Sequence, residues 1–116
     1  MKRLSLVLII CFLAACKSPN KIPDDVIGIN KMKLIVWDMM RAGSLADAQY
    51  GKDPHMLKMK TTELFRQVFA IHGISKDEFY KSYRYYEENP DKNKILMDSV
   101  TAYANRQRQE LFKRMR

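Results

Sequence analysis

Cysteine, histidine and long apolar runs are all scarce in this chain of 116 residues. The two cysteines, Cys11 and Cys16, lie near the N-terminus, so the rest of the chain can form neither a disulfide nor a thiolate metal site. His55 and His72 are the only imidazoles, and on one helix they would lie roughly 25 Å apart, too far to share a metal. The apolar stretch at residues 4–15 is shorter than the roughly 20 residues that a membrane-spanning helix needs.

Sequence motifs that carry catalysis are also missing. The chain contains neither a Gly-x-Ser-x-Gly nucleophile turn nor a glycine-rich phosphate loop. Glu87 and Glu88 are adjacent, but neighbouring side chains on a helix diverge by about 100°, so the two carboxylates are not poised as an acid and base couple. We therefore expect no enzymatic activity, no metal and no cofactor.

The first 16 residues have the three-part layout of a secretory signal. Lys2 and Arg3 precede an apolar segment, residues 4–12, and small residues follow it. Leu-Ala-Ala-Cys, ending at Cys16, resembles the bacterial lipobox, in which the thiol is alkylated with diacylglycerol and the peptide bond before it is cut. We expect residues 1–15 to be removed and Cys16 to anchor the mature chain in a membrane, because two or three acyl chains on one residue give stable attachment. Cleavage by an ordinary signal peptidase and a permanent transmembrane helix are the alternatives.

The chain is basic. Its formal net charge is +8, and removal of Lys2 and Arg3 leaves about +6. A basic domain often binds nucleic acid, but a lipidated envelope protein does not encounter it, so no nucleic-acid partner is expected. The predicted counter-surfaces are anionic headgroups, cell-wall polymer and acidic proteins, which a positive field attracts. A charged surface that serves only solubility is the alternative.

The mature chain divides into a tether and a helical domain. Residues 16–29 contain two prolines, a glycine and no helical period, which predicts a flexible tether. Residues 30–116 have helical periodicity throughout, and no segment has the alternation of a strand. The sequence predicts an all-α fold, a small antiparallel bundle of about four helices joined by short turns.

Local signals predict where the first two helices begin and end. Asn30 is expected to cap the first helix, and Gly51 to end it. Asp53 is expected at the next N-cap, with Pro54 at the first helical position. Gly73 is expected to end the second helix in the left-handed conformation. The expected buried stripes of the two helices are Met32, Ile35, Val36, Met39, Ala42, Ala46 and Tyr50, then Leu57, Leu64, Phe65, Val68 and Phe69.

Two further helices are predicted after Gly73. Ser75 and Glu78 form a capping box at the start of the third helix, and Asn89 is expected to close this helix and to cap the fourth. Residues 106–116 are expected to project as a basic, partly frayed end. The expected inner residues are Phe79, Tyr83 and Tyr86 on the third helix, then Leu96, Val100 and Tyr103 on the fourth. Of the four tyrosines on the third helix, one or two must be exposed to water.

Two segments carry a family resemblance. One is His-Gly-Ile-Ser-Lys-Asp-Glu-Phe at residues 72–79, followed by Ser82, Tyr85, Tyr86, Asn89 and Pro90. The other is Ile-Pro-Asp-Asp-Val-Ile at residues 22–27, followed by Met32, Ile35, Asp38 and Ala42. Together they resemble the small lipoproteins of Bacteroidota that contain domain of unknown function 4296. The Gly-Ile-Ser turn is also similar to turns in helical, substrate-holding parts of periplasmic foldases, whose isomerase portion has no counterpart here. The resemblance implies a lineage and a cellular location without an assigned activity.

The residues after the anchor bear on its membrane. Lys17 is not the aspartate that commonly marks inner-membrane retention, and residues 17–21 lack the acidic residues that resemble surface-export signals in that lineage. We expect attachment to the outer membrane, facing the periplasm.

The first helix carries a second apolar stripe that indicates a partner surface. Leu34, Trp37 and Leu45, with Ala48, lie roughly opposite the core stripe at 100° per residue, and Arg41 interrupts them. A helix sandwiched between its neighbours would have the same pattern. Arg41 favours partial exposure, because a buried arginine would need a partner such as Asp38. The candidate partner-binding residues are therefore Leu34, Trp37, Arg41 and Leu45.

These observations predict a non-catalytic accessory that binds envelope proteins or helps to assemble them. The alternative is a structural adaptor held by one outer-membrane complex or by the cell wall. The sequence leaves the oligomeric state open.

Overall fold

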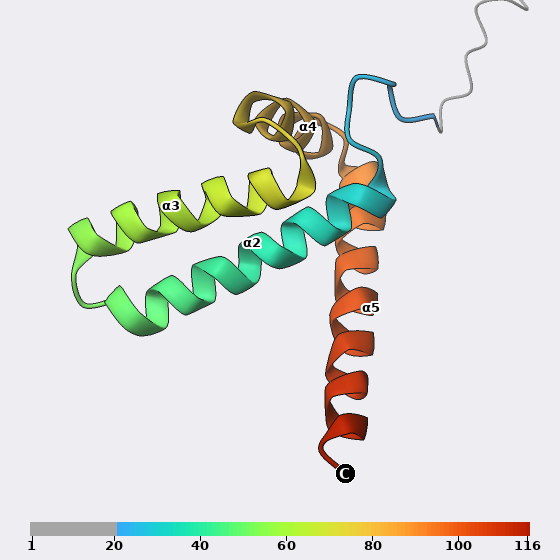
Figure 1. Cartoon of the computed structure of the whole chain (residues 1–116). Helices are drawn as coiled ribbons and strands as arrows, with labels where there is room; N and C mark the ends of the chain where they lie inside the picture. The colour runs from blue at the N-terminus through green and yellow to red at the C-terminus, as the bar shows by residue number, and fades with distance from the viewer. Residues whose placement is uncertain (1–20) are drawn as a thin grey trace, which may run out of the picture.

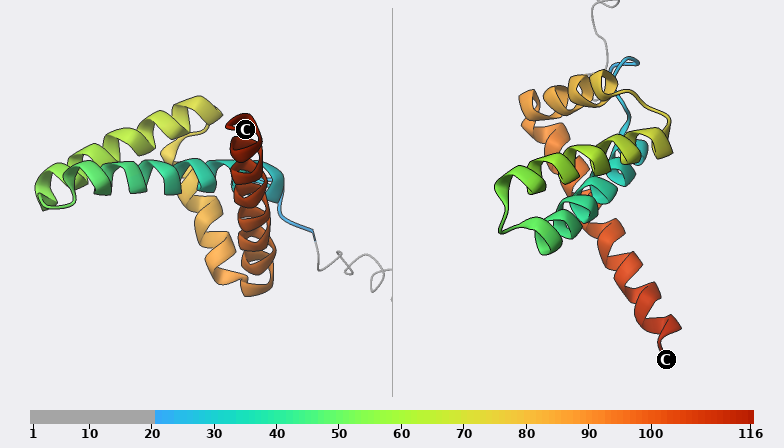
Figure 2. Two further views of the ribbon diagram at one scale, coloured as in Figure 1. Left: turned by 90° about the horizontal axis from the view of Figure 1, so that it is seen from below. Right: turned by 60° about the vertical axis from the view of Figure 1, so that its left-hand side comes forward.

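The computed structural model describes residues 21–116, and within that range it contains four helices and no strand (Figure 1). The helices are α2 (Ile29–Tyr50), α3 (Pro54–His72), α4 (Lys76–Glu88) and α5 (Pro90–Arg114). α2 and α3 form one hairpin, and α4 and α5 form a second hairpin that crosses the first (Figure 2). The predicted all-α fold is confirmed. Cys16, the predicted signal peptide and the first part of the predicted tether lie outside the described residues.

Three predicted helix ends are confirmed in atomic detail. Asp53 Oδ1 accepts from the backbone N–H groups of the second and third residues of α3, at 3.1 Å each, and Pro54 occupies the first helical position. Gly73 has a φ of 66° and a ψ of 34°, and the N–H of Ile74 donates to the Phe69 carbonyl at 3.0 Å. Ser75 Oγ accepts from the third backbone N–H of α4 at 3.0 Å. These ends need only neighbouring residues, so local sequence predicts them well.

The predicted cap at Asn30 is wrong, and the cap predicted at Asn89 is confirmed only in its position. α2 begins at Ile29 with Gly28 at its N-cap, and Asn30 already lies in the first turn. Asn89 stands between α4 and α5, but its side-chain amide donates to the Tyr85 carbonyl at 2.7 Å. It therefore closes the end of α4 and makes no side-chain cap on α5. The helix boundary there is still set by Pro90, which disfavours helical geometry in the residue before it.

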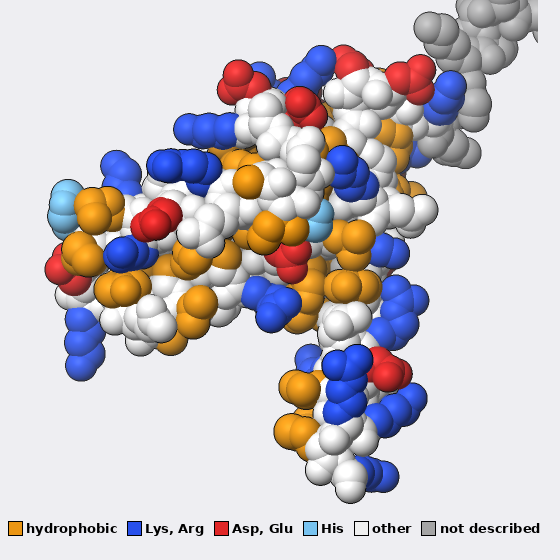
Figure 3. Space-filling model, in the orientation of Figure 1, with side chains coloured by type: hydrophobic (Ala, Val, Ile, Leu, Met, Phe, Trp, Pro, Cys, Tyr) orange, Lys and Arg blue, Asp and Glu red, His pale blue; other side chains and the backbone are white. Residues whose placement is uncertain are grey.

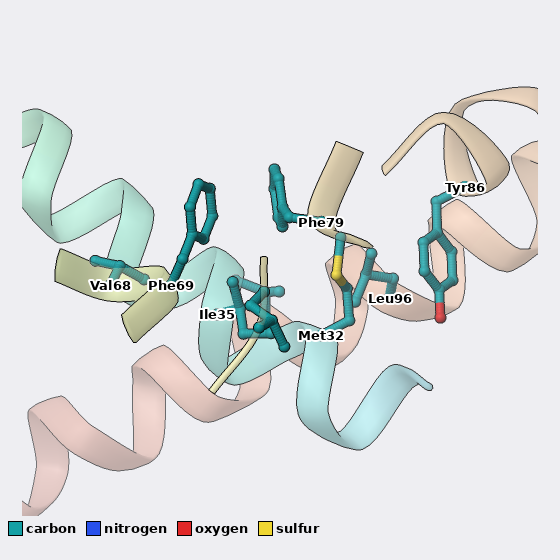
Figure 4. Close-up of a cluster of buried hydrophobic side chains, with 9 residues drawn as sticks. Met32, Ile35, Val68, Phe69, Phe79, Tyr86 and Leu96 are labelled. Carbon is teal, nitrogen blue, oxygen red and sulfur yellow. The ribbon is translucent and has the colours of Figure 1, made fainter. Parts of the chain in front are cut away.

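The core lies where the two hairpins cross. Met32 and Ile35 of α2 are fully buried and meet Val68 and Phe69 of α3 and Leu96 of α5 (Figure 4). The core positions of α4 are Phe79, Ser82 and Tyr86. Tyr83, which we predicted to face inward, is 45% exposed, and the small Ser82 takes the inward position instead. Ser82 suits this buried position because its hydroxyl accepts a hydrogen bond from a segment that is distant in sequence.

That segment is residues 21–28, which precede α2. The N–H of Ile27 donates to Ser82 Oγ at 2.9 Å, and Tyr86 Oη donates to the Ile27 carbonyl at 2.7 Å. Asp25 forms an ion pair with Lys81 at 2.6 Å, and this ammonium lowers the pKa of the Asp25 carboxyl. The segment also contributes apolar side chains to the core, namely Ile22, Val26 and Ile27. These contacts correct the predicted boundary, because the second half of the predicted 16–29 tether is docked on α4.

The end of α5 projects from the body of the protein (Figures 1 and 2). Leu96 and Val100 are buried, whereas every residue from 105 to 116 is exposed. We call residues 105–116 the arm. The projection was predicted, but the predicted fraying is wrong, because α5 remains helical to Arg114. None of the helices within residues 21–116 is both long enough and apolar enough to cross a membrane.

Candidate functional site

The four candidate partner-binding residues lie on one side of α2, with unequal exposure. Leu34 and Trp37 are partly buried, whereas Arg41 and Leu45 are exposed. The Trp37 ring meets the Tyr103 ring of α5 edge to face, with 6.4 Å between the centroids. α5 therefore covers part of this side near Trp37. The remainder of the predicted second stripe, at Arg41 and Leu45, is open to solvent.

A groove runs beside these residues between α2 and α3. It encloses about 660 Å³, and its walls are mostly apolar. Leu45 is 52% exposed and Ile71, on the α3 side, is 77% exposed. The other lining residues are Trp37, Asp38, Met40, Arg41, Ala42, Ser44, Leu64, Gln67 and Val68. We call this hollow the hairpin groove. Large apolar side chains this exposed on one concave surface are typical of an interaction site.

A second hollow lies in the angle between α2 and the projecting part of α5. It encloses about 440 Å³, and we call it the arm cleft. Trp37 and Arg41 form its α2 side and also line the hairpin groove, so the two hollows adjoin. The α5 side consists of Ala104, Gln107, Arg108, Glu110, Leu111 and Arg114. Figure 3 shows apolar side chains on the side of the arm that faces the α2–α3 hairpin, with lysines and arginines around them.

Positive charge is concentrated on the arm. Residues 105–116 contain five lysines and arginines and one glutamate, which gives a net charge of +4. Residues 21–104 contain 13 basic and 12 acidic residues, which gives only +1. Glu110 is paired with Lys113 at 3.2 Å. Within the described part of the chain, neither Arg108 nor Arg114 has an ion-pair partner.

Asp38 joins α2 to the end of α3. Its Oδ2 lies 2.7 Å from His72 Nε2, and its Oδ1 lies 3.9 Å from the Arg41 guanidinium. Because an ionised carboxylate can only accept, the His72 nitrogen donates this bond. The sequence had named Asp38 as the partner that a buried Arg41 would need, and the two are paired although Arg41 is exposed. Sequence reasoning missed the pairing of Asp38 with His72. Residues 21–116 contain no group of three or more His, Cys, Asp or Glu side chains that could hold a metal ion.

The tyrosines of α4 divide between core and solvent, and at least one is exposed as expected, although Tyr83 was predicted to face inward. Tyr86 is 1% exposed, whereas Tyr80 and Tyr83 are 40% and 45% exposed. Tyr83 borders a small apolar hollow of about 240 Å³ between α2, α3 and α4. A hydrogen bond to the Glu87 carboxylate raises the pKa of the Tyr83 hydroxyl. The hairpin groove beside Trp37 is larger, and its Leu45 and Ile71 are more than half exposed, which makes that side the candidate site.

Comparison with known proteins gives a family and no activity. The model of a family described as a domain of unknown function (DUF4296) matches residues 23–110, which is more than half of the chain. No curated protein and no solved structure matches it. The matched range begins at Pro23, within the segment that docks on α4.

Proposed function

This chain belongs to the family of domain of unknown function 4296, and we propose that it is a non-catalytic binding module whose working surface surrounds Trp37. Its role would be to hold or help assemble other envelope proteins. The family description names no activity, so the proposal depends on the chain's own surface.

One observation carries this proposal: the hairpin groove and the arm cleft adjoin at Trp37 and Arg41. Trp and Arg are the residue types most enriched at the centres of protein interfaces. Exposed apolar side chains surround them, and Leu45, Ile71 and Leu111 are each more than half exposed. A flexible methionine, Met40, is 50% exposed and also lines the groove, which suits contact with irregular apolar surfaces.

The proposal includes a lipid anchor at Cys16 and a location on the periplasmic side of the outer membrane. It rests on the Leu-Ala-Ala-Cys sequence and on the residues that follow it. Only four residues separate Cys16 from Lys21, where the described structure begins, so the five steps between them span at most roughly 18 Å at about 3.5 Å each. A domain on so short a linker remains close to the membrane that holds it.

Site-specific photo-crosslinking in intact cells tests the binding role. A photoreactive amino acid at Leu45 should form crosslinks to envelope proteins, because that position opens into the hairpin groove. The same amino acid at Thr62, an exposed α3 residue outside the groove, is the matched control. Trp37→Ala should lower the yield at Leu45, and Tyr80→Ala, which removes an exposed aromatic from α4, should not.

The identity of the crosslinked proteins separates the two roles open for such a module. Several unrelated envelope proteins would indicate an accessory that holds clients, whereas one folded complex or the cell wall would indicate a structural adaptor. Equal yields at Leu45 and Thr62, or a yield unaffected by Trp37→Ala, would show that this surface is not the binding site.

A further inference from the structure

The arm cleft has a chemical character that narrows its partner. We propose that it binds an acidic segment of a partner protein that presents an apolar face flanked by carboxylates. This inference rests on the proposed binding function and specifies its ligand class. It starts from the two arginines of the arm that line the cleft, Arg108 and Arg114. Glu110, the acidic residue of the cleft, is already paired with Lys113, and Arg41 on the α2 side is paired with Asp38.

The arm presents an apolar strip bordered by positive charge. At 100° per residue, Leu111 and Met115 fall on the same side of α5 as Ala104, with Arg108 beside them. Phe112 and Met115 are 56% and 67% exposed. A helix of this kind, with apolar side chains between arginines, matches a segment that carries the opposite charge around an apolar face.

Charge distribution favours an acidic occupant over a second copy of this chain. The arm holds +4 of the +5 net charge of residues 21–116. A symmetric contact would bring two such arms together, and the like charges would repel each other. An acidic segment instead supplies the carboxylates that Arg108 and Arg114 lack, and arginine binds carboxylates through two parallel hydrogen bonds.

The position of the arm favours a protein over the bilayer that would hold the anchor. The first described segment, drawn in blue, lies at the same end of the molecule as α4 and the start of α5, whereas the C-terminus lies at the opposite end (Figure 1). α5 has 25 residues, which at 1.5 Å each give a length of about 37 Å. This length exceeds the roughly 18 Å that residues 16–21 can span, so the arm reaches the anchored surface only when the molecule lies along it, and an upright molecule presents the arm to proteins.

Trp37 provides a built-in reporter, because it is the only tryptophan and lines the arm cleft. The full-length protein, held in nanodiscs of neutral phosphatidylcholine, is titrated with three synthetic helical peptides. All share one leucine stripe, and the residues that flank the stripe are glutamate, glutamine or lysine. The glutamate peptide should change Trp37 emission at a concentration at least about tenfold lower than the glutamine peptide requires. The lysine peptide should have the weakest effect. Added salt should weaken binding of the glutamate peptide more than binding of the other two peptides.

Matched variants locate the charge effect. The double variant Arg108→Gln, Arg114→Gln should bind the glutamate peptide about tenfold more weakly. The control double variant Arg66→Gln, Arg84→Gln changes exposed residues of α3 and α4, and its affinity for the peptide should stay within about twofold of the unmodified protein's. Glutamine keeps helix propensity close to that of arginine, and circular dichroism checks that α5 stays helical.

The proposal would be overturned by equal affinity for the glutamate and glutamine peptides, or by no response to the glutamate peptide at about 1 mM. Equal losses of affinity in the two variant pairs, or concentration-dependent self-association that occupies the cleft, would overturn it as well. A Trp37 response to phosphatidylglycerol nanodiscs in place of the peptide would assign the arm to anionic lipid and would also overturn it. Crosslinking at Leu45 decides the broader binding function separately, because it reports occupancy of the hairpin groove whatever the charge of the partner.

Discussion

The docking of residues 21–28 on α4 leads to the sharpest stability prediction. Tyr86→Phe removes one hydroxyl that donates to the Ile27 carbonyl at 2.7 Å. A neutral hydrogen bond contributes about 0.5–1.5 kcal/mol, and a buried group left without a partner costs about 1–3 kcal/mol. Because Tyr86 is 1% exposed, water does not easily replace the hydroxyl. We expect the free energy of unfolding to fall by about 1–2 kcal/mol.

Urea unfolding of the chain from Asn20 onward, followed by circular dichroism, measures this loss. A domain of this size has a urea dependence of about 1–1.5 kcal/mol per molar, so the midpoint should fall by about 1 M. Tyr80→Phe is the control, because it removes the same atom from a side chain of α4 that is 40% exposed, and it should change stability by less than about 0.5 kcal/mol. Trypsin cleavage after Lys21 should also become faster in Tyr86→Phe alone. Equal midpoints for the two variants would refute the docking of Ile27 on α4.

Four further predictions follow from single positions. Gly73→Ala should lower the free energy of unfolding by about 1–2 kcal/mol, because backbone strain at φ 66° alone opposes the added methyl group. Gly43→Ala, inside α2, should raise it by about 0.5–1 kcal/mol. Destabilisation by both substitutions in urea unfolding would contradict this reasoning. Trp37→Ala should cost less than the roughly 3–5 kcal/mol of a core tryptophan, and a larger loss, or an indole that quenchers cannot reach, would identify it as core. Cys16→Ala should abolish lipid labelling. The anchor would be refuted if mass spectrometry of the native protein found the N-terminus at another residue and without the mass of acyl chains. Burial raises the pKa of Tyr86 to about 12 from 10.0, so the unfolded chain loses this proton first and stability should fall by at most about 2 kcal/mol between pH 10 and 12. A pH titration of the unfolding midpoint should show a shallower fall in Tyr86→Phe.

Helix periodicity predicted part of the geometry around Trp37. Helical periodicity separated the core stripe of α2 from the side that carries Trp37 and Leu45, because both sides follow from the 100° advance per residue. Periodicity also suggested the pairing of Arg41 with Asp38, since residues three apart are neighbours on a helix. The same reasoning missed the apolar side of the arm at Leu111. An isolated stripe after Gln107 is too short to reveal which surface it faces.

Local sequence by itself determined the helices of residues 21–116 and several of their ends. Asp53 and Ser75 bond to amides two or three residues away, and Gly73 alone permits the left-handed turn, so these ends require no distant contact. This is why they could be predicted without a fold.

Only the tertiary structure decided the features that join distant segments. Ile27 meets Ser82 and Tyr86 across 55 and 59 residues of sequence, and His72 meets Asp38 across 34. Such pairs depend on how the two hairpins cross, and the periodicity of one helix carries no information about that crossing. The same crossing places the arm opposite Trp37. The sequence supplies the apolar and basic side chains, but only the packing of α5 against α2 brings them together to form the arm cleft.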